Sequence, residues 1–271
     1  MKNVCFLVFL LFFNLIYGIY NGNPSEPDMP ELGVHISNEN WWGIKFGYLL
    51  DHTFWKKVDY SEPQTVEALG IEQLINDISA SCQFQKNSAV LTFNIIDRVE
   101  LFTHLGSMNM TLSSFLKDST SVLYKAKDQF FWGVGGRIIL VYWAEVVMGV
   151  NALYQNALLN SDSLSVNQKP LSSKGHSFRY KEWQLGISFS REIGMCIPYV
   201  GLAYASMNSS LHNLPKAPIM KPNLANQTIG NSEPFILYLG VGLTNGQLFA
   251  INIESRLIGE QAISFFANLR F

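Results

Sequence analysis

The sequence predicts an all-β protein, a transmembrane antiparallel up-and-down β-barrel of about ten strands, with twelve strands as the alternative. Segments of alternating apolar and polar residues recur along the chain, each about long enough to cross a bilayer as a tilted strand. Short turns and long loops alternate between them. The composition combines 48% hydrophobic with only 15% charged residues and a formal net charge of -2. Such a composition excludes a disordered chain and a strongly basic nucleic-acid-binding protein.

Residues 1–22 are expected to form a secretory signal peptide, which leaves residues 23–271 as the barrel. Lys2 gives a basic start, an apolar run extends from Val4 to Ile19, and the small residues Gly18 and Gly22 bracket the expected cut. A transmembrane anchor is the alternative. It is disfavoured because the run is short and turn-forming residues follow it. The chain is therefore expected to be exported.

The final strand, residues 261–271, shows the alternation that defines the prediction. Ile263, Phe265, Ala267, Leu269 and Phe271 fall on one face, while the other face is mostly polar. A strand that ends the chain on an aromatic residue is typical of outer-membrane barrels. The last strand is thus expected to face lipid on one side and the lumen on the other.

The same pattern predicts nine earlier strands. They are expected at residues 42–51, 88–95, 98–106, 129–140, 144–155, 183–190, 197–206, 235–243 and 249–256. Leu49 breaks the alternation of the first. A hydrophobic helix over residues 130–150 is the alternative to one hairpin, but Arg137 and Glu145 would lie within it and β-branched and aromatic residues dominate. Asn245-Gly246 predicts a tight hairpin turn.

The connections support closure into a barrel. Long ones follow the first, third, fifth and seventh strands, and short ones follow the second, fourth, sixth and eighth; only the short connection after the ninth breaks the rule. If short turns lie at the periplasmic edge, the long loops face outward and both ends of the barrel lie on the periplasmic side. Residues 63–79 have helical spacing, so the first long loop is expected to contain a short amphipathic helix. Residues 110–127, 156–175 and 208–233 are expected to be loops.

The polar strand faces are rich in Gly, Ala, Ser, Asn and charges of both signs, as expected for a crowded, water-filled lumen. The candidate pore-lining residues are Lys45, Arg98, Glu100, His104, Arg137, Glu145, Glu254, Arg256 and Arg270. Because their signs are mixed, ion selectivity is expected to be weak. Four tryptophans fall near the expected membrane rims, where aromatic belts occur: Trp42, Trp55, Trp132 and Trp143.

No catalytic residue, cofactor or metal site is expected. His52 beside Asp51 and His176 beside Ser177 could suggest hydrolysis, but adjacent strand residues point to opposite faces. The phosphate-loop, dinucleotide, CxxC and HExxH motifs do not occur in the sequence.

Several segments also resemble a known family in their order along the chain. They are GNPSEP (residues 22–27), IKFGYLLDHTFWKKV (44–58), FNIIDRVELFTHLGS (93–107), FWGVGGRIILVYW (131–143), EWQLGISFS with PYVGLAYAS (182–206) and INIESRLIGEQAISFFANLRF (251–271). These segments resemble the chlamydial major outer membrane porins. The resemblance implies a general-diffusion porin of the outer membrane that is often oligomeric and cross-linked by disulfides.

The chain departs from that family in two respects. It is much shorter than the usual members, which bears on strand number and pore width. After the expected cut it keeps only Cys82 and Cys196, which are expected near opposite edges of the membrane and so too far apart to pair within one barrel. An intermolecular disulfide through either cysteine stays open.

Two functions are therefore compared. The first is a porin that lets small hydrophilic solutes and ions diffuse, narrowed by the helix expected at residues 66–78 folding inward. The second is a structural or adhesive barrel with a closed lumen, acting through its outer loops, because ten strands enclose little space. The expected partners are outer-membrane lipids, small solutes and further copies of the chain, and no nucleic acid.

Overall fold

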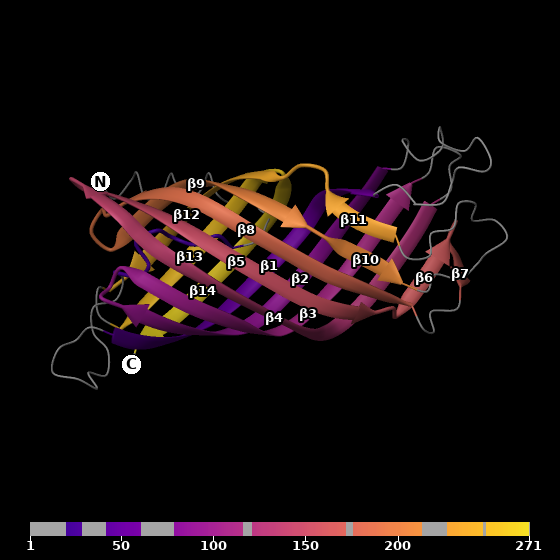
Figure 1. Cartoon of the computed structure of the whole chain (residues 1–271), viewed down its shortest axis with the longest axis horizontal. Coiled ribbons are helices and arrows are strands. Elements are labelled where there is room, and N and C mark those ends of the chain that lie inside the picture. Colours follow the sequence, from indigo (N-terminus) through magenta and orange to yellow (C-terminus); the bar gives the residue numbers. More distant parts are fainter. Residues whose placement is uncertain are drawn as a thin grey trace.

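In the computed structural model, ten antiparallel strands close into one barrel (Figure 1). The structure describes residues 20–28, 42–60, 79–115, 121–171, 176–212, 227–245 and 248–270. The barrel strands are β1 (Trp42–Tyr60), β2 (Ser79–Ile95), β3 (Val99–Phe115), β4 (Ser121–Trp143), β5 (Val146–Asn160), β8 (Ser177–Arg191), β9 (Cys196–Met207), β12 (Phe235–Thr244), β13 (Phe249–Ile258) and β14 (Glu260–Arg270). None of the described residues belongs to a helix long and apolar enough to span a membrane.

The barrel closes between its first and last strands. β14 pairs with β1 over residues 45–56, with Phe46 opposite Leu269 and Asp51 opposite Ser264. Neighbouring strands along the chain pair antiparallel around the rest of the ring. The predicted fold class and all ten predicted strands are thereby confirmed, and both described ends of the barrel wall, Trp42 and Arg270, lie at the same edge.

Short turns join the strands at that edge, which we call the short-turn end. Ile96 and Asp97 link β2 to β3 with φ of 54° and 51°, and Ala144 has φ 54° between β4 and β5. The long connections lie at the opposite edge, the long-loop end, on the right in Figure 1. The connection that broke the predicted rule is Gly259, which joins β13 to β14 with φ 81°. By the usual geometry of such barrels the short-turn end faces the periplasm.

Six strands are longer than the pattern predicted by three residues or more, and part of the predicted loops is strand. β3 and β4 extend through most of residues 110–127. Four short strands also form: β6 (Ser163–Val166), β7 (Lys169–Leu171), β10 (Ser209–His212) and β11 (Gln227–Asn231). The loop assignments at 110–127, 156–175 and 208–233 were therefore wrong in part. The helix expected at residues 63–79 lies outside the described residues, except for Ser79, which begins β2.

The ring changes composition toward the long-loop end. β9, β12, β13 and β14 stop early, and β10 and β11 fill the space between β8 and β1. The ring there consists of β1 to β5, β8, β10 and β11, on the right in Figure 1. A ring of this size is just wide enough for side chains to fill its interior.

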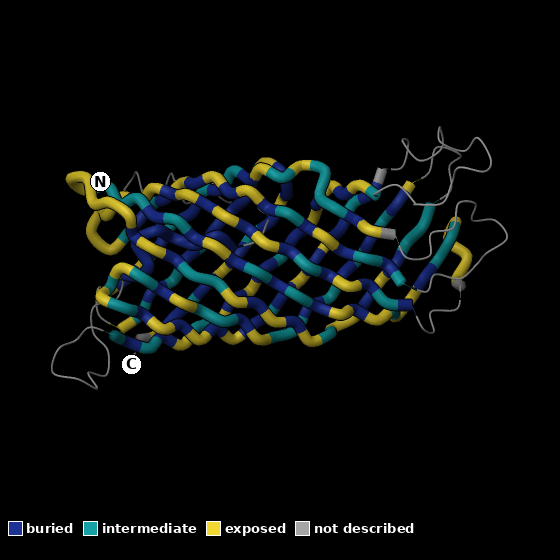
Figure 2. Tube along the Cα trace, in the orientation of Figure 1, coloured by how far each residue is buried: buried dark blue, intermediate teal, exposed yellow. Residues whose placement is uncertain are grey.

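The polarity of the wall inverts along the barrel axis. From the short-turn end up to about Trp55 on β1, the outward side chains are apolar and the inward ones mostly polar; we call this the membrane half. The exposed apolar side chains of β1 extend from Phe46 to Trp55, a stretch of ten residues that matches the roughly 9 to 11 needed to cross a bilayer. Figure 2 shows the alternation of buried and exposed residues along each strand.

The remainder, the upper half, has the opposite arrangement. Its outward residues are mostly polar and include Lys57, Asp59, Gln83, Gln85, Lys125, Lys127, Asp128, Asn160, Arg179 and Lys181. The side chains inside this half are mostly apolar. A polar surface around an apolar core is the pattern of a protein in water, so the upper half is expected to stand above the membrane.

Aromatic side chains mark the boundary between the halves. Trp132 packs against Tyr154, with ring centroids 5.7 Å apart, and Trp183 packs against Tyr204 at 5.4 Å. These residues face outward on adjacent strands. They form the belt expected at a membrane–water interface, and Trp55 lies at the same boundary on β1, as predicted.

Candidate functional site: the barrel lumen

The chain's own N-terminal stretch fills the membrane half of the lumen. Residues 20–27 are all buried inside the barrel, and only Asp28 of the described stretch is exposed. We call residues 20–28 the lumen segment. The sequence predicted an extended lead-in here, but its polar and proline-rich composition gave no sign that the barrel would enclose it.

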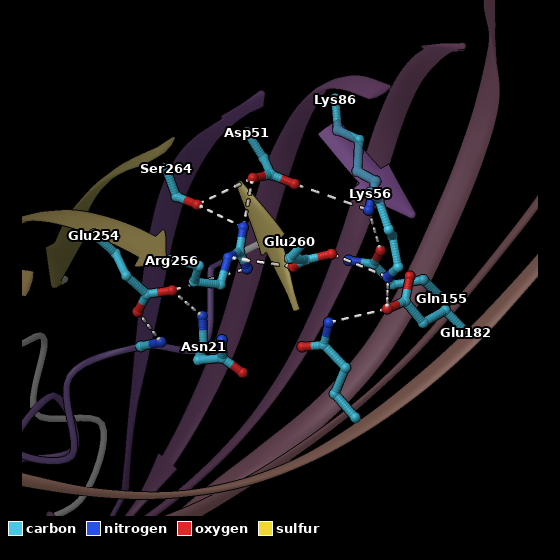
Figure 3. A network of polar contacts seen from close by, with 12 residues as sticks. Asn21, Asp51, Lys56, Lys86, Gln155, Glu182, Glu254, Arg256, Glu260 and Ser264 are labelled. Carbon is cyan, nitrogen blue, oxygen red and sulfur yellow. Dashed lines mark hydrogen bonds and ion pairs between the residues drawn. The ribbon is translucent and has the colours of Figure 1, made fainter. Parts of the chain in front are cut away.

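Backbone and side-chain hydrogen bonds hold the start of the lumen segment. The amides of Asn21 and Gly22 donate to the two carboxylate oxygens of Glu254 at 2.6 and 2.9 Å (Figure 3). Ser25 lies 2.6 Å from Ser190, hydroxyl to hydroxyl. Each of these partners faces inward from the wall, so the segment satisfies polar groups that would otherwise be buried without partners.

Glu26 ties the segment to the opposite wall. Its carboxylate lies 2.7 Å from Arg137 and accepts from Asn268 at 2.9 Å and from the Tyr20 hydroxyl at 2.5 Å.

The ring of Tyr20 explains two irregularities of the sequence. Leu49 and Phe266 are apolar residues on faces that are otherwise polar, and both are buried around Tyr20 together with Val90. The ring centroids of Tyr20 and Phe266 lie 5.1 Å apart. The break in the alternation at Leu49 was therefore a sign of an apolar group inside the lumen.

Buried ion pairs surround the lumen segment and continue above it. Lys45 and Arg137 both pair with Glu100, at 2.6 and 2.9 Å. Farther up, Arg256 lies 3.1 Å from Asp51 and 3.4 Å from Glu260. All of these side chains are 5% exposed or less, so the charges pair with one another and not with water.

Lys56 joins this network to the upper half of the lumen. Its ammonium lies 2.6 Å from Glu182 and 3.0 Å from Glu260 (Figure 3). Lys86, one strand away, donates to Gln155 at 2.7 Å and lies 3.8 Å from Asp51. The network therefore crosses the lumen from β1 to β8 and to β14.

An apolar cluster lies inside the barrel above the charges. The upper cluster comprises Val58, Ala80, Cys82, Phe84, Met108, Met110, Leu112, Tyr124, Ala126, Phe131, Ala157, Leu159, Leu164, Phe178, Tyr180, Met207, Leu211 and Ile229. Each of these residues is at most 4% exposed. No charged side chain belongs to the cluster.

Two cavities lie along the described lumen segment. The cavity between the lumen segment and the wall, beside His104 and Arg137, has a volume of about 10 Å³, enough for one water molecule. A larger pocket of about 490 Å³ lies at the short-turn end, between Ser25 and Asp28 of the segment and the turns at Glu145 and Glu192. It is a vestibule below the segment and does not pass through the barrel.

The structure places the predicted pore-lining residues in three ways. Those that face inward are Lys45, Glu100, His104, Arg137, Glu254 and Arg256. Arg98 and Glu145 are exposed in the short turns instead, because β3 begins at Val99 and β5 at Val146. Glu145 pairs there with Arg191. The backbone of Arg270 pairs with Lys45, and its side chain lies outside what the structure describes.

The sequence pattern missed several inward charges because their strands extend beyond the predicted limits. Lys56, Lys86, Glu182 and Glu260 lie just outside the predicted strands. The period-2 rule continued through β2, β8 and β14 would have found the last three, whereas an irregularity between Thr53 and Lys56 shifts β1 by one residue, so that the rule places Lys56 outward. Nothing in the pattern pointed to Glu26.

The two cysteines have different surroundings. Cys82 is buried inside the upper cluster, so it cannot reach another chain, and an intermolecular disulfide through Cys82 is contradicted by its inward position. Cys196 starts β9 at the short-turn end and is half-buried. An intermolecular disulfide therefore remains an expectation for Cys196 alone.

The neighbouring residues considered for hydrolysis diverge. Asp51 is buried in the lumen network, whereas His52 faces outward and stacks on Phe54 with ring centroids 3.7 Å apart. His176 is buried and Ser177 is half-exposed. Neither pair forms a nucleophile with a base.

Replacing Gly22 by alanine is expected to dislodge the lumen segment. Gly22 has φ +93°, and a Cβ there would lie 2.0 Å from Nη2 of Arg137. The strain in a left-handed conformation alone is worth about 1–2 kcal/mol, so the amides of residues 21–23, 25 and 26 should exchange hydrogen roughly tenfold faster or more. Gly194→Ala is the matched control, since Gly194 has φ +64° but nothing within 4 Å. Hydrogen-exchange mass spectrometry measures this rate. Equal exchange of these amides in both variants would contradict the position of the lumen segment inside the barrel.

The position of the lumen segment inside the barrel also predicts where the signal peptide is cut. Tyr20, Asn21 and Gly22 contribute contacts that cleavage after Gly22 would remove. We therefore expect cleavage after Gly18, so that the mature chain starts at Ile19. Intact-mass measurement of protein from the membrane fraction distinguishes the two sites, and a mature chain starting at Asn23 would contradict this expectation.

Comparisons with known proteins bear on the family. No family model matches the sequence. The major outer membrane porin, serovar A, of Chlamydia trachomatis is 21% identical over 92% of this chain and 94% of that protein. The chain is thus similar to the chlamydial major outer membrane porins. The serovar F porin of the same species and the porin of Chlamydia pneumoniae are each 23% identical over 68% of this chain and 69% of theirs. The suspected resemblance is thus confirmed, and the protein is a barrel of the outer membrane.

Solved structures are less similar to the chain in sequence than these porins are. The outer membrane protease OmpT from Escherichia coli aligns with TM-score 0.38 and 8% identity over 84% of this chain and 93% of that chain. The Pseudomonas putida toluene transporter TodX aligns with TM-score 0.31 and 9% identity over 94% and 93%. These scores are too low to carry an argument about function.

Proposed function

We propose that this porin relative is a structural barrel of the outer envelope whose lumen is closed in its resting state. The observation that carries the proposal is the upper cluster, whose 18 apolar residues fill the ring formed by β1 to β5, β8, β10 and β11. An ion crossing this cluster would have to be desolvated without a compensating partner. The lumen segment adds a second closure below it.

The barrel would then act through its surfaces. Its apolar wall contacts lipid, and its polar upper half reaches beyond the membrane with the long-loop end outermost. A non-enzymatic role is part of the proposal, and the porins among its relatives support it. Self-association is an expectation from the same resemblance.

A second candidate, passive diffusion of small solutes and ions, is favoured by one observation. The membrane half is lined by charged and polar groups, and a short segment held there mostly by polar contacts fills it. If the lumen segment withdrew, Lys45, Glu100, Arg137, Glu254 and Arg256 would line a hydrated passage. Carboxylates and cations would both remain, so selectivity would be weak. The upper cluster would still have to rearrange.

Planar-bilayer recording separates the two candidates. The refolded full chain, checked for heat-modifiable gel migration, is expected to give no conductance steps. Because the upper cluster remains in place, a variant lacking residues 20–28 is also expected to stay silent. Steps from the full chain would overturn the closed barrel in favour of the porin. Steps from the shortened variant alone would identify the lumen segment as the gate of a pore.

A further inference from the structure

A groove opens on the lipid-facing wall of the membrane half, across β4, β5 and β8. Its volume is about 420 Å³, and it is lined by outward residues such as Val134, Tyr154, Trp183 and Leu185. Gly136 and Ala152 form its floor because their small side chains leave a gap between larger neighbours. The groove is apolar and lies at the height of the lipid chains, just inside the aromatic belt.

Two cations follow directly above it on one of the same strands. Going toward the long-loop end, the outward residues of β8 are Trp183, Lys181 and Arg179, each about 7 Å from the next. Both cations therefore lie above the belt, where the headgroups of the outer leaflet begin. Over the four positions from Trp183 to Arg179, β8 therefore rises from the level of the lipid chains through the interface to the level of the headgroups.

These cations lack carboxylate neighbours. Asn156 is opposite Lys181, and Leu158 and Ser210 are opposite Arg179. Within the described part of the chain, neither cation forms an ion pair. By contrast, Lys127 of the upper half lies 3.1 Å from Asp162. A pair of cations left without an internal partner favours an external anion.

We propose that the groove and the two cations together bind one anionic lipid of the outer leaflet. A chain of the lipid lies in the groove, and its phosphate binds Arg179 and Lys181. Guanidinium and ammonium groups both bind phosphate well, and Asn156 and Ser210 can donate further hydrogen bonds. This site requires only the outer-membrane location, and it is independent of whether the lumen conducts.

A second copy of the chain is the other occupant that an apolar groove could take. A symmetric contact through this face would bring each pair of cations against the same pair on its partner. The like charges would repel one another at the edge of the contact. The charges above the groove therefore favour a lipid.

Native mass spectrometry of the refolded barrel in a neutral detergent tests the site with three probes. Dimyristoyl phosphatidic acid is expected to be retained at one copy per barrel. Dimyristoyl glycerol, which lacks the phosphate, should be retained about tenfold less, in line with the loss of charge-assisted hydrogen bonds. Inorganic phosphate should not displace the bound lipid, because it cannot occupy the groove. Displacement by inorganic phosphate would overturn the proposal in favour of a simple anion site.

Variants separate the two parts of the site. R179Q/K181Q should lower retention of phosphatidic acid about tenfold, and A152L should lower it by filling the groove. The matched controls are K127Q, a cation already paired with Asp162, and A89L, an added apolar group on the outward face of β2 away from the groove. Heat-modifiable migration confirms that each variant folds. Equal retention by wild type and R179Q/K181Q would overturn the proposal. So would an A152L variant that changes the oligomer mass while its lipid retention is unchanged.

Discussion

Lys56→Met is expected to destabilise the folded barrel by about 3–5 kcal/mol, the usual cost of removing one partner from a buried ion pair. Lys56 is 1% exposed and lies between Glu182 and Glu260, which are themselves at most 2% exposed. Without the ammonium, two carboxylates share a site that water does not reach. The midpoint of urea unfolding in lipid vesicles, followed by heat-modifiable migration, measures the loss.

The next residue of the same strand provides the control. Lys57 faces outward, is 46% exposed and lies 3.9 Å from Glu233, so Lys57→Met should change stability by at most about 1 kcal/mol. The double variant Lys56→Met with Glu182→Gln should recover much of the loss, because Glu260 keeps Arg256 at 3.4 Å. Similar midpoints for Lys56→Met and Lys57→Met would show that water reaches the network. That result would favour the hydrated lumen of a porin.

The barrel itself could be predicted because its determinants are local. Alternation with period 2 places the side chains on a strand, and turn residues place the strand ends. Residues 235–243 and 249–256 illustrate this, since β12 and β13 match the prediction to within two residues, although Gly246 of the turn predicted between them lies outside the described residues. Closure followed from an even number of such strands.

The upper half could not be predicted in the same way. There the rule that apolar means outward no longer holds, since Phe84 and Met110 point inward while Gln83 and Lys125 point outward. Alternation with period 2 continues there, shifted by one residue in β1 and β4, but water now lies outside the wall and apolar side chains lie inside it. A search for apolar outward faces therefore ended each strand at the membrane boundary and assigned the rest to loops.

The contents of the lumen depend on contacts between distant parts of the chain. Glu26 and Arg137 are 111 positions apart, and Gly22 and Glu254 are 232 apart. No spacing rule relates such residues. The local sign that existed, Leu49 on a polar face, becomes informative only once Tyr20 is known to lie against it.

The polarity inversion predicts opposite outcomes for one substitution at two places on the same face of β2. Leu91 and Gln83 both point outward, and Leu91 is 45% exposed. Leu91→Lys should destabilise the barrel by about 2–4 kcal/mol, the cost of a cation facing the lipid midplane. Gln83→Lys should be close to neutral because it faces water. Urea midpoints in vesicles measure both.

The comparison also separates this fold from its alternatives, because each assigns a different solvent to the two positions. In a water-soluble barrel Leu91→Lys would be nearly harmless, since the side chain is already exposed. In a barrel immersed over its whole length Gln83→Lys would cost about as much as Leu91→Lys.

Phe84 tests whether the upper cluster is packed. It lies next to Gln83 but is buried in that cluster at 1% exposure. Phe84→Ala should cost about 3–5 kcal/mol if that cluster is a packed core, whereas a negligible loss would mean that water already fills the upper lumen.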